Sequence, residues 1–283
     1  MSGLLASVGI AASLTYVAAM AALWLAQSRI VFQPGTPAER MPMHTPADAG
    51  LEYESVVLHA ADGVRLAGWY VPGPRPDSPV VLFCHGNAGN IGDRIETLTA
   101  LHEIGAATLI FDYRGFGASE GRPSEKGLRR DARAAWDWLT EARSVPSARI
   151  VLYGRSLGGA VAAGLGAETR PAGLVLESTF TSLPDLAARL YPWAPARWLS
   201  RYRFDTAARL AHVGAPVLVA HSPEDEVIPF AHAERLAAMR PPAIALERLR
   251  GSHDEAFPQA RATFLAALER FLAQTVPEPV HDD

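Results

Sequence analysis

The chain has 283 residues, of which 49% are hydrophobic and 20% charged, enough for one large domain or two small ones. Its 26 basic and 30 acidic side chains give a net charge of −4 without a basic cluster, which argues against a nucleic-acid partner. The only cysteine, Cys84, can form neither an internal disulfide nor a cysteine-based zinc site. No linker or internal repeat divides the chain, so we expect a single globular domain.

The N-terminal segment 1–28 contains no charged side chain and is mostly alanine, leucine, valine, isoleucine and methionine over its central part. Such a stretch is long enough to span a bilayer. A cleaved signal peptide is the alternative, but a charged n-region is missing and the apolar stretch exceeds the usual length of about 7 to 15 residues. We therefore predict a single-pass membrane anchor at 1–28. Arg29 and Arg40 follow it, a small positive excess that favours a cytoplasmic position for the domain.

A proline-rich connector at 29–50 leads to the domain expected at 51–274, and the tail at 275–283 is predicted to be disordered. Two apolar runs joined by the turn Ala61-Asp62-Gly63 predict an antiparallel pair at a sheet edge. From Pro79 onward, short apolar strands alternate with helical segments, which is typical of a parallel, doubly wound α/β sheet, here of about eight strands. The strands are predicted at 55–58, 64–71, 80–84, 107–111, 150–153, 174–176, 216–220 and 244–249.

Two glycine-rich turns follow strands of this sheet, at the edge where ligands bind in such folds. The turn His85-Gly86-Asn87-Ala88-Gly89-Asn90 lacks the Lys-Ser/Thr ending of a phosphate-binding loop. The segment 112–121 is superficially similar to the dinucleotide glycine pattern, but its third glycine comes one residue late and Pro123 precedes the helix. We interpret it as a structural turn in which Asp112 and Arg114 are hydrogen-bonded.

A third turn, Gly154-Arg155-Ser156-Leu157-Gly158, joins a short apolar strand to a helix of small residues. It fits the nucleophile elbow, a strained turn whose flanking glycines leave room for the backbone and whose serine hydroxyl stands exposed above the sheet. The pattern alone is weak, because a bare Gly-x-Ser-x-Gly arises by chance in about one chain in ten of this length. A glycine-rich turn with a capping serine is the alternative.

Two later loops favour the elbow. Asp225 and His253 follow the last two predicted strands, so Ser156, Asp225 and His253 come in the chain order nucleophile, acid, histidine that is typical of α/β-hydrolase triads. Glu177 is the alternative acid, because it also follows a strand close to the elbow. The backbone N–H groups of Leu157 and Asn87 are predicted to form the oxyanion hole.

A long segment, about 178–214, separates two strands that would ordinarily be joined by a handful of residues. We interpret it as an inserted lid. Its aromatic side chains stand beside prolines, a composition suited to the wall of an apolar pocket, with ordinary helix packing as the alternative. The lid aromatics are Tyr191, Trp193, Trp198, Tyr202 and Phe204, and the first three are the predicted pocket residues.

From residue 55 to about residue 273, the chain resembles the α/β-hydrolase superfamily, and more narrowly its Bem-type, α/β-hydrolase domain-containing protein 13-like branch of N-terminally anchored serine hydrolases. The resemblance implies an α/β-hydrolase fold and hydrolase activity but no particular substrate. It departs at His221-Ser222, where the family usually has His-Gly. The segments that carry it are 85–91, 112–117, 154–159, 177–180, 225–229 and 251–253.

We therefore expect a serine hydrolase that cleaves an ester or thioester through an acyl-enzyme, without metal or organic cofactor. Serine rather than aspartate at the elbow argues against dehalogenase and epoxide-hydrolase chemistry. A serine aminopeptidase-type peptidase and a non-catalytic binding protein of the same fold are the alternatives. The expected partners are the membrane, through the N-terminal helix, and an acyl substrate resident there, such as a lipid or an acylated protein.

Overall fold

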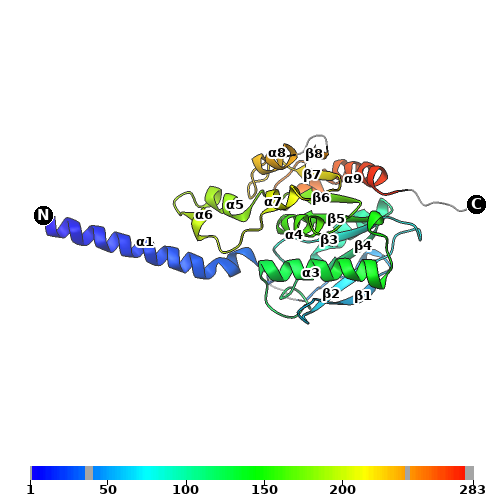
Figure 1. Ribbon diagram of the computed structural model, residues 1–283, viewed down its shortest axis with the longest axis horizontal. Helices are drawn as coiled ribbons and strands as arrows, with labels where there is room; N and C mark the ends of the chain where they lie inside the picture. The colour runs from blue at the N-terminus through cyan, green and yellow to red at the C-terminus, as the bar shows by residue number, and fades with distance from the viewer. Residues whose placement is uncertain (1, 36–40, 240–242, 278–283) are drawn as a thin grey trace, which may run out of the picture.

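The computed structural model describes residues 2–35, 41–239 and 243–277, and within them the chain forms one sheet of eight strands (Figure 1). The strand order is β1-β2-β4-β3-β5-β6-β7-β8. Each of the eight predicted strands is present, with ends shifted by at most two residues. The strands are β1 Glu54–His59, β2 Arg65–Val71, β3 Val80–Cys84, β4 Ala107–Phe111, β5 Ile150–Arg155, β6 Gly173–Glu177, β7 Val217–His221 and β8 Ile244–Arg248.

The pairing follows from the length of the connections. β1 and β2 are joined by a tight turn and pair antiparallel, as predicted, and β2 continues antiparallel onto β4. From β4 to β8 every pair is parallel, and the strands β3, β4, β6 and β7 are buried along their whole length. Helices therefore cover both faces of this part of the sheet, which requires continuous apolar strands.

Alternate residues of each strand face the two helical layers. Leu82 and Leu152 belong to a core with α3 and α4, whereas Val81 and Val151 belong to a second core with α2 and α9. This is the doubly wound arrangement that the sequence predicts. The helices of the domain are α2 Ile95–Glu103, α3 Glu125–Asp137, α4 Leu157–Gly166, α5 Leu183–Leu190, α6 Ala196–Leu199, α7 Thr206–Leu210, α8 Ala231–Ala237 and α9 Ala256–Thr275.

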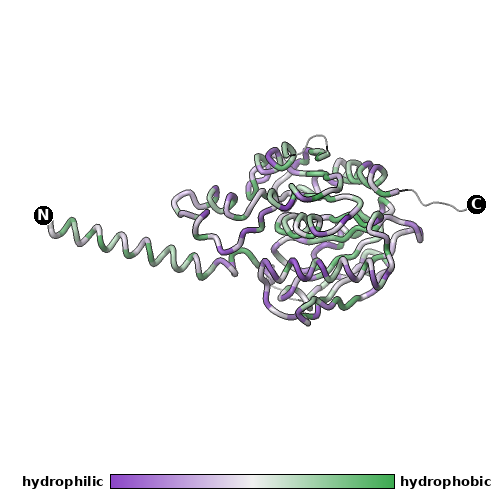
Figure 2. The backbone as a smooth tube through the Cα atoms, in the orientation of Figure 1, coloured by the Kyte–Doolittle hydropathy of each residue, from purple (hydrophilic) through white to green (hydrophobic). Residues whose placement is uncertain are grey.

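The N-terminal helix α1, Ser2–Val31, projects away from the domain (Figure 1) and carries few hydrophilic residues (Figure 2). It is long and apolar enough to cross a membrane, and a signal sequence passes the same test. The helix runs three residues beyond the predicted anchor, and Phe32 directly after it is buried in the domain. The rest of the predicted connector includes residues 36–40, which lie outside the described residues, as do residues 278–283 of the predicted tail.

The turn after β4 is the structural element that the sequence predicts. The Arg114 guanidinium is buried against two carboxylates, 2.7 Å from Oδ1 of Asp131 and 2.8 Å from Oδ2 of Asp62. Asp112 accepts a hydrogen bond of 3.0 Å from the backbone N–H of Ile91. Gly117 permits this position of Asp112, because a Cβ there would lie 1.9 Å from the carboxylate.

Candidate active site

Ser156 lies in the sharp turn between β5 and α4. Its backbone has φ 54° and ψ −120°, a conformation that side-chain-bearing residues rarely adopt and that is typical of a nucleophile elbow. The two motif glycines are sterically required. A Cβ on Gly158 would lie 2.0 Å from the carbonyl oxygen of Cys84, and a Cβ on Gly154 would lie 2.3 Å from that of Gly158.

Neighbouring strand ends hold this strained turn. The Ser156 N–H donates to the carbonyl of Glu177 over 2.9 Å, and the Thr179 hydroxyl donates to the carbonyl of Ser156 over 2.7 Å. Gly159 makes room for that hydroxyl, since a Cβ there would lie 2.5 Å from Thr179 Oγ1. Two hydrogen bonds from the strand beside β5 thus fix the serine backbone in place. Sequence reasoning did not single out Thr179.

The three residues predicted to act together are far apart along the chain, but the structure joins them one after another by hydrogen bonds. His253 Nε2 is 3.2 Å from Ser156 Oγ, and His253 Nδ1 is 2.7 Å from Asp225 Oδ2. The three come from the ends of β5, β7 and β8, which the parallel sheet brings to one edge. Such a chain allows the imidazole to take the serine proton while the carboxylate stabilises the resulting cation.

Asp225 is held as an anion. Its Oδ1 accepts from the backbone N–H groups of Val227, at 3.0 Å, and Ile228, at 2.7 Å, while His221 Nε2 lies 3.2 Å from its Oδ2. Burial by itself would raise the pKa of Asp225, but the hydrogen bonds from His221 and His253 and those from the backbone hold it well below its usual value. His221, at the point where the sequence departs from the family pattern, is a buried neighbour of this carboxylate.

The His253 loop is held by an arginine that the sequence pattern treats as variable. Arg155 Nη2 donates to the carbonyl oxygens of His253, at 3.1 Å, and Asp254, at 3.2 Å. From the other side, the His253 N–H donates to Glu226 over 3.2 Å. Nothing in the motif identifies Arg155, since the position before the serine is unspecified in Gly-x-Ser-x-Gly.

Glu177, the alternative acid, has other partners. Its carboxylate accepts from the Tyr153 hydroxyl, and Arg155 Nε lies 3.8 Å from its Oε1. The group is fully buried under the elbow. The structure therefore brings His253 together with Asp225 and leaves Glu177 in a separate cluster with Tyr153 and Arg155.

The loop with Asn87 is fixed by the segment that follows α1. The Gln33 N–H donates to the carbonyl of Asn87 over 2.9 Å, and the Gly89 N–H donates back to Gln33 over 3.3 Å. The Asn87 side-chain amide donates to the carbonyl of Val31 over 3.3 Å. Leu157, the other predicted oxyanion donor, is the first residue of α4, where a backbone N–H has no partner within its helix.

His85, at the start of the same loop, is fully buried. Its Nδ1 lies 2.8 Å from the carbonyl of Gly86, and the Tyr113 hydroxyl donates to the His85 carbonyl over 3.1 Å. Burial lowers the pKa of His85 to about 3, so the ring is neutral. Burial also raises the pKa of Asp112, whose Oδ1 is 3.7 Å from His85 Nε2, to about 7.

The lid contains three short helices, and its aromatics divide between inside and outside. Phe204 and the half-buried Tyr202 pack against Phe32, with ring centroids 6.1 and 5.1 Å from it. Tyr191 is half-buried, whereas Trp193 is 56% exposed and Trp198 90% exposed. The pocket role predicted for Tyr191, Trp193 and Trp198 stays a prediction. The exposure of the two tryptophans to solvent does not support that role for them.

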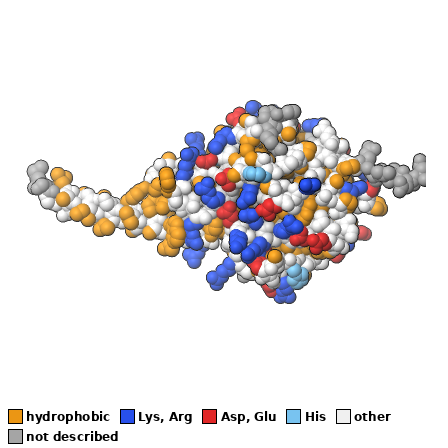
Figure 3. All heavy atoms as spheres, in the orientation of Figure 1, with side chains coloured by type: hydrophobic (Ala, Val, Ile, Leu, Met, Phe, Trp, Pro, Cys, Tyr) orange, Lys and Arg blue, Asp and Glu red, His pale blue; other side chains and the backbone are white. Residues whose placement is uncertain are grey.

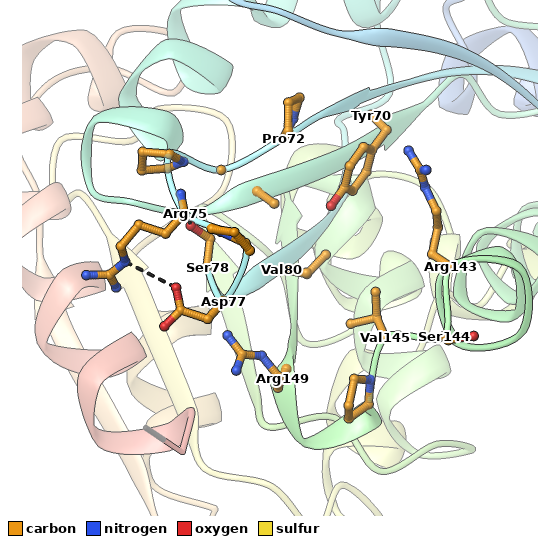
Figure 4. A pocket seen from close by; sticks show the side chains of 15 residues that line it. Tyr70, Pro72, Arg75, Asp77, Ser78, Val80, Arg143, Ser144, Val145 and Arg149 are labelled. Atoms are coloured by element: carbon orange, nitrogen blue, oxygen red, sulfur yellow. Dashed lines mark hydrogen bonds and ion pairs between the residues drawn. The ribbon is translucent and has the colours of Figure 1, made fainter. Parts of the chain in front are cut away.

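A hollow of about 850 Å³ lies at the other end of the strands, where β3, β4 and β5 begin (Figure 4). Arg75, Arg143 and Arg149 line it, and Arg75 is paired with Asp77 over 3.4 Å. None of Ser156, Asp225 and His253 takes part in it. Among the described residues, no group of three or more His, Cys, Asp or Glu side chains is arranged to hold a metal ion.

Comparison with known proteins agrees with this architecture. The family described as serine aminopeptidase, S33, matches residues 75–204. An esterase of Pyrococcus furiosus superposes with a TM-score of 0.69 at 20% identity, covering 84% of this chain and 98% of the esterase. An α/β hydrolase from Vibrio vulnificus superposes with a TM-score of 0.68 at 24% identity, covering 80% and 82%. The fold is therefore that of the α/β hydrolases.

Curated relatives narrow the class. The α/β-hydrolase domain-containing protein WAV2 of Arabidopsis thaliana is 33% identical over 290 residues, 94% of each chain. Protein bem46 of Schizosaccharomyces pombe is 32% identical over 235 residues, 78% of this chain and 77% of the relative. An uncharacterised Mycobacterium tuberculosis protein is 42% identical over 257 residues, 89% of each chain. The chain therefore belongs to the α/β-hydrolase superfamily, in its Bem-type branch.

Proposed function

We propose that the chain is a serine acyl hydrolase that cleaves an ester or thioester with Ser156 as nucleophile, His253 as general base and acid, and Asp225 as the orienting carboxylate. The observation that carries the proposal is the continuous hydrogen-bonded chain Ser156–His253–Asp225, at 3.2 and 2.7 Å. His253 takes the hydroxyl proton as Ser156 attacks the acyl carbon, then returns it to the leaving group. Water then attacks the acyl carbon while His253 takes its proton, and the acid is released as the bond to Ser156 Oγ breaks and His253 returns the proton to that oxygen.

The tetrahedral intermediate needs hydrogen-bond donors placed before the reaction begins. We propose the backbone N–H groups of Leu157 and Asn87 for this role. The first is available because it opens α4, and the second is supported by the hydrogen bonds between Gln33 and the 87–89 loop. No step of this scheme calls for a metal or an organic cofactor.

Replacement of Gln33 by proline is expected to lower kcat by about tenfold or more, because proline lacks the N–H that holds the Asn87 carbonyl, and removal of one oxyanion donor costs about 10² to 10³. Gln33→Ala keeps that N–H and is the matched control. Turnover of a p-nitrophenyl ester by both variants measures the effect. Equal activities of the proline and alanine variants would argue against a role for this contact.

A peptidase is the second candidate function, favoured by the match to the serine aminopeptidase family over residues 75–204. The same triad serves both chemistries, and the lid and pocket select the acyl group. Assays of purified protein against p-nitrophenyl esters, acyl thioesters and aminoacyl amides separate the two. Turnover of amides alone would replace the acyl-hydrolase proposal with the peptidase.

We also propose that α1 stays attached as a membrane anchor, because its apolar stretch is longer than the roughly 7 to 15 residues usual in a signal peptide. After expression of the full chain, the intact mass is expected in the membrane fraction and is expected to resist a carbonate wash. A soluble product with a mass matching cleavage near residue 26 would contradict the anchor. We propose separately that the domain lies on the cytoplasmic side, because Arg29 and Arg40 follow the apolar segment.

The proposed substrate is a membrane-resident or amphiphilic acyl compound, since an anchor raises the effective concentration of the domain for substrates partitioned into the bilayer. A longer acyl chain gains about 0.8 kcal/mol for each CH₂ that it buries. In a series of p-nitrophenyl esters, kcat/KM is expected to rise with chain length and with added liposomes. Activity confined to acetate and butyrate, and indifferent to lipid, would contradict this substrate class.

A further inference from the structure

The lid contacts the C-terminal half of α1, which is the half nearer to the domain. The Tyr16 hydroxyl donates to the carbonyl of Trp193 over 3.2 Å. About three turns further along α1, the Gln27 side chain donates to the carbonyl of Leu199 over 2.8 Å and accepts from the N–H of Arg201 over 2.7 Å. Met20, on the same helical face between them, is buried. From Tyr16 onward, one face of α1 therefore lies against the lid.

The turn of α1 that contacts the lid near Trp193 lies within the part of the helix that is apolar enough to cross a membrane. That part is Gly3–Val31, about 44 Å long at about 1.5 Å per residue. A bilayer has a hydrocarbon core of about 30 Å, which about 20 helical residues span. Because every stretch of that length within Gly3–Val31 includes Tyr16, a bilayer crossed by α1 contains the turn that carries the lid segment around Trp193.

This lid segment has the side chains of a membrane interface. Leu190, Trp193 and Trp198 are 46%, 56% and 90% exposed, and tryptophan is enriched where membrane and water meet. The lid, about 178–214, contains five arginines and two aspartates, so its charge is positive although that of the chain is −4. In Figure 3, orange hydrophobic side chains run along α1 onto the adjoining part of the domain, where blue basic side chains begin.

A cation–π pair joins α1 to the lid close to the domain. The Arg201 guanidinium lies 4.5 Å from the centre of the Trp24 ring, at the end of α1 that is nearer to the domain. Trp24 is eight residues from Tyr16, about 12 Å along the helix. An arginine over a tryptophan suits the phosphate layer, with Trp193 on the side of the hydrocarbon.

We propose that the lid tip, defined as residues 190–198, enters a phospholipid bilayer beside α1 and is a second membrane contact of the protein. This inference rests on the proposed anchor and is independent of the triad. Its occupant is the lipid, because the tip contacts the helix that crosses the same bilayer, and the lid arginines that flank it, Arg189 and Arg201, complement phosphate groups. The lid is thereby held at the membrane surface, facing any substrate partitioned there.

Fluorescence quenching of the full chain in vesicles of phosphatidylcholine and phosphatidylserine tests the proposal. The only native cysteine, Cys84, is fully buried, so a single NBD fluorophore can be placed at Trp198→Cys, with Leu190→Cys as a second position. Val57→Cys on β1, at a site 58% exposed and at the far edge of the sheet, is the matched control. The quenchers are phosphatidylcholine with a doxyl group on its acyl chain, and aqueous iodide.

The two lid labels are expected to be quenched several-fold more by the doxyl lipid than the label at 57, and several-fold less by iodide. Iodide quenching as strong at 198 and 190 as at 57, with the protein retained through a carbonate wash, would overturn the lid contact alone. Shielding from both quenchers would assign the tip to a protein neighbour and overturn it too. Loss of the chain in the wash would remove the anchor and this inference together, whereas fluorophosphonate labelling of Ser156 reports the proposed function separately.

Discussion

Replacement of Ser156 by alanine is expected to lower kcat by about 10⁶, the scale of loss when the serine of such a triad is removed, and to abolish labelling by a fluorophosphonate probe. The reason is that the Ser156 hydroxyl oxygen, 3.2 Å from His253 Nε2, is the only protein atom in the proposed scheme that bonds to the acyl carbon. Gel detection of the labelled protein and hydrolysis of a p-nitrophenyl ester measure the two effects.

Ser178→Ala is the matched control for this experiment. Ser178 follows the neighbouring strand β6, is fully buried, and has a positive φ of 45° beside the 54° of Ser156. Its hydroxyl has no hydrogen-bond partner among the described residues, so its loss leaves no group unpaired. The control is expected to label like the wild type. Equal labelling of Ser156→Ala, or a folded wild type that does not label, would contradict the assignment of the nucleophile.

The strands and the elbow could be predicted because their signals are local. Apolar runs such as Val80 to Cys84, each bounded by turn residues, identify buried parallel strands without any knowledge of their neighbours. The elbow is similar, since Gly154 and Gly158 are required by contacts within the same strand, turn and helix and by the strand beside them. The chain order of Ser156, Asp225 and His253 then places each at one sheet edge once the strands are known to be parallel.

The supporting contacts could not be predicted because they join segments that are distant in sequence. Arg155 holds carbonyls almost a hundred residues away, and Gln33 pairs with a loop that follows β3. No periodicity reports such pairs. Composition also does not predict which way a side chain faces. Trp198 and Phe204 contribute alike to an aromatic lid, but Trp198 is exposed and Phe204 is buried. The same limit applies to Glu177 and Asp225, which both follow strands and differ only in their neighbours.

Asp225→Asn is expected to lower kcat by about 10⁴, the effect of the same change in a well-studied triad, because an amide cannot stabilise the imidazolium and favours the wrong tautomer of the histidine. The carboxylate of the wild type lies 2.7 Å from His253 Nδ1. Since hydrogen bonds hold its pKa below the usual value of 3.8, Asp225 is ionised throughout the neutral range. The loss is measured as kcat for a p-nitrophenyl ester at pH 8, where the wild-type carboxylate is ionised.

The sign of the linkage gives a second measurement. A carboxyl group whose pKa is depressed by folding stabilises the native state above its unfolded value, and that stability is lost as the pH falls below 3.8 through the folded pKa. On acidification, the midpoint temperature of thermal unfolding should thus fall more for the wild type than for Asp225→Asn.

Glu177→Gln is the matched control for the activity measurement. Glu177 is a buried carboxylate at the next strand end that contacts Tyr153 and Arg155 rather than His253. A mild effect of Asp225→Asn together with a severe one of Glu177→Gln would transfer the role of the acid to Glu177.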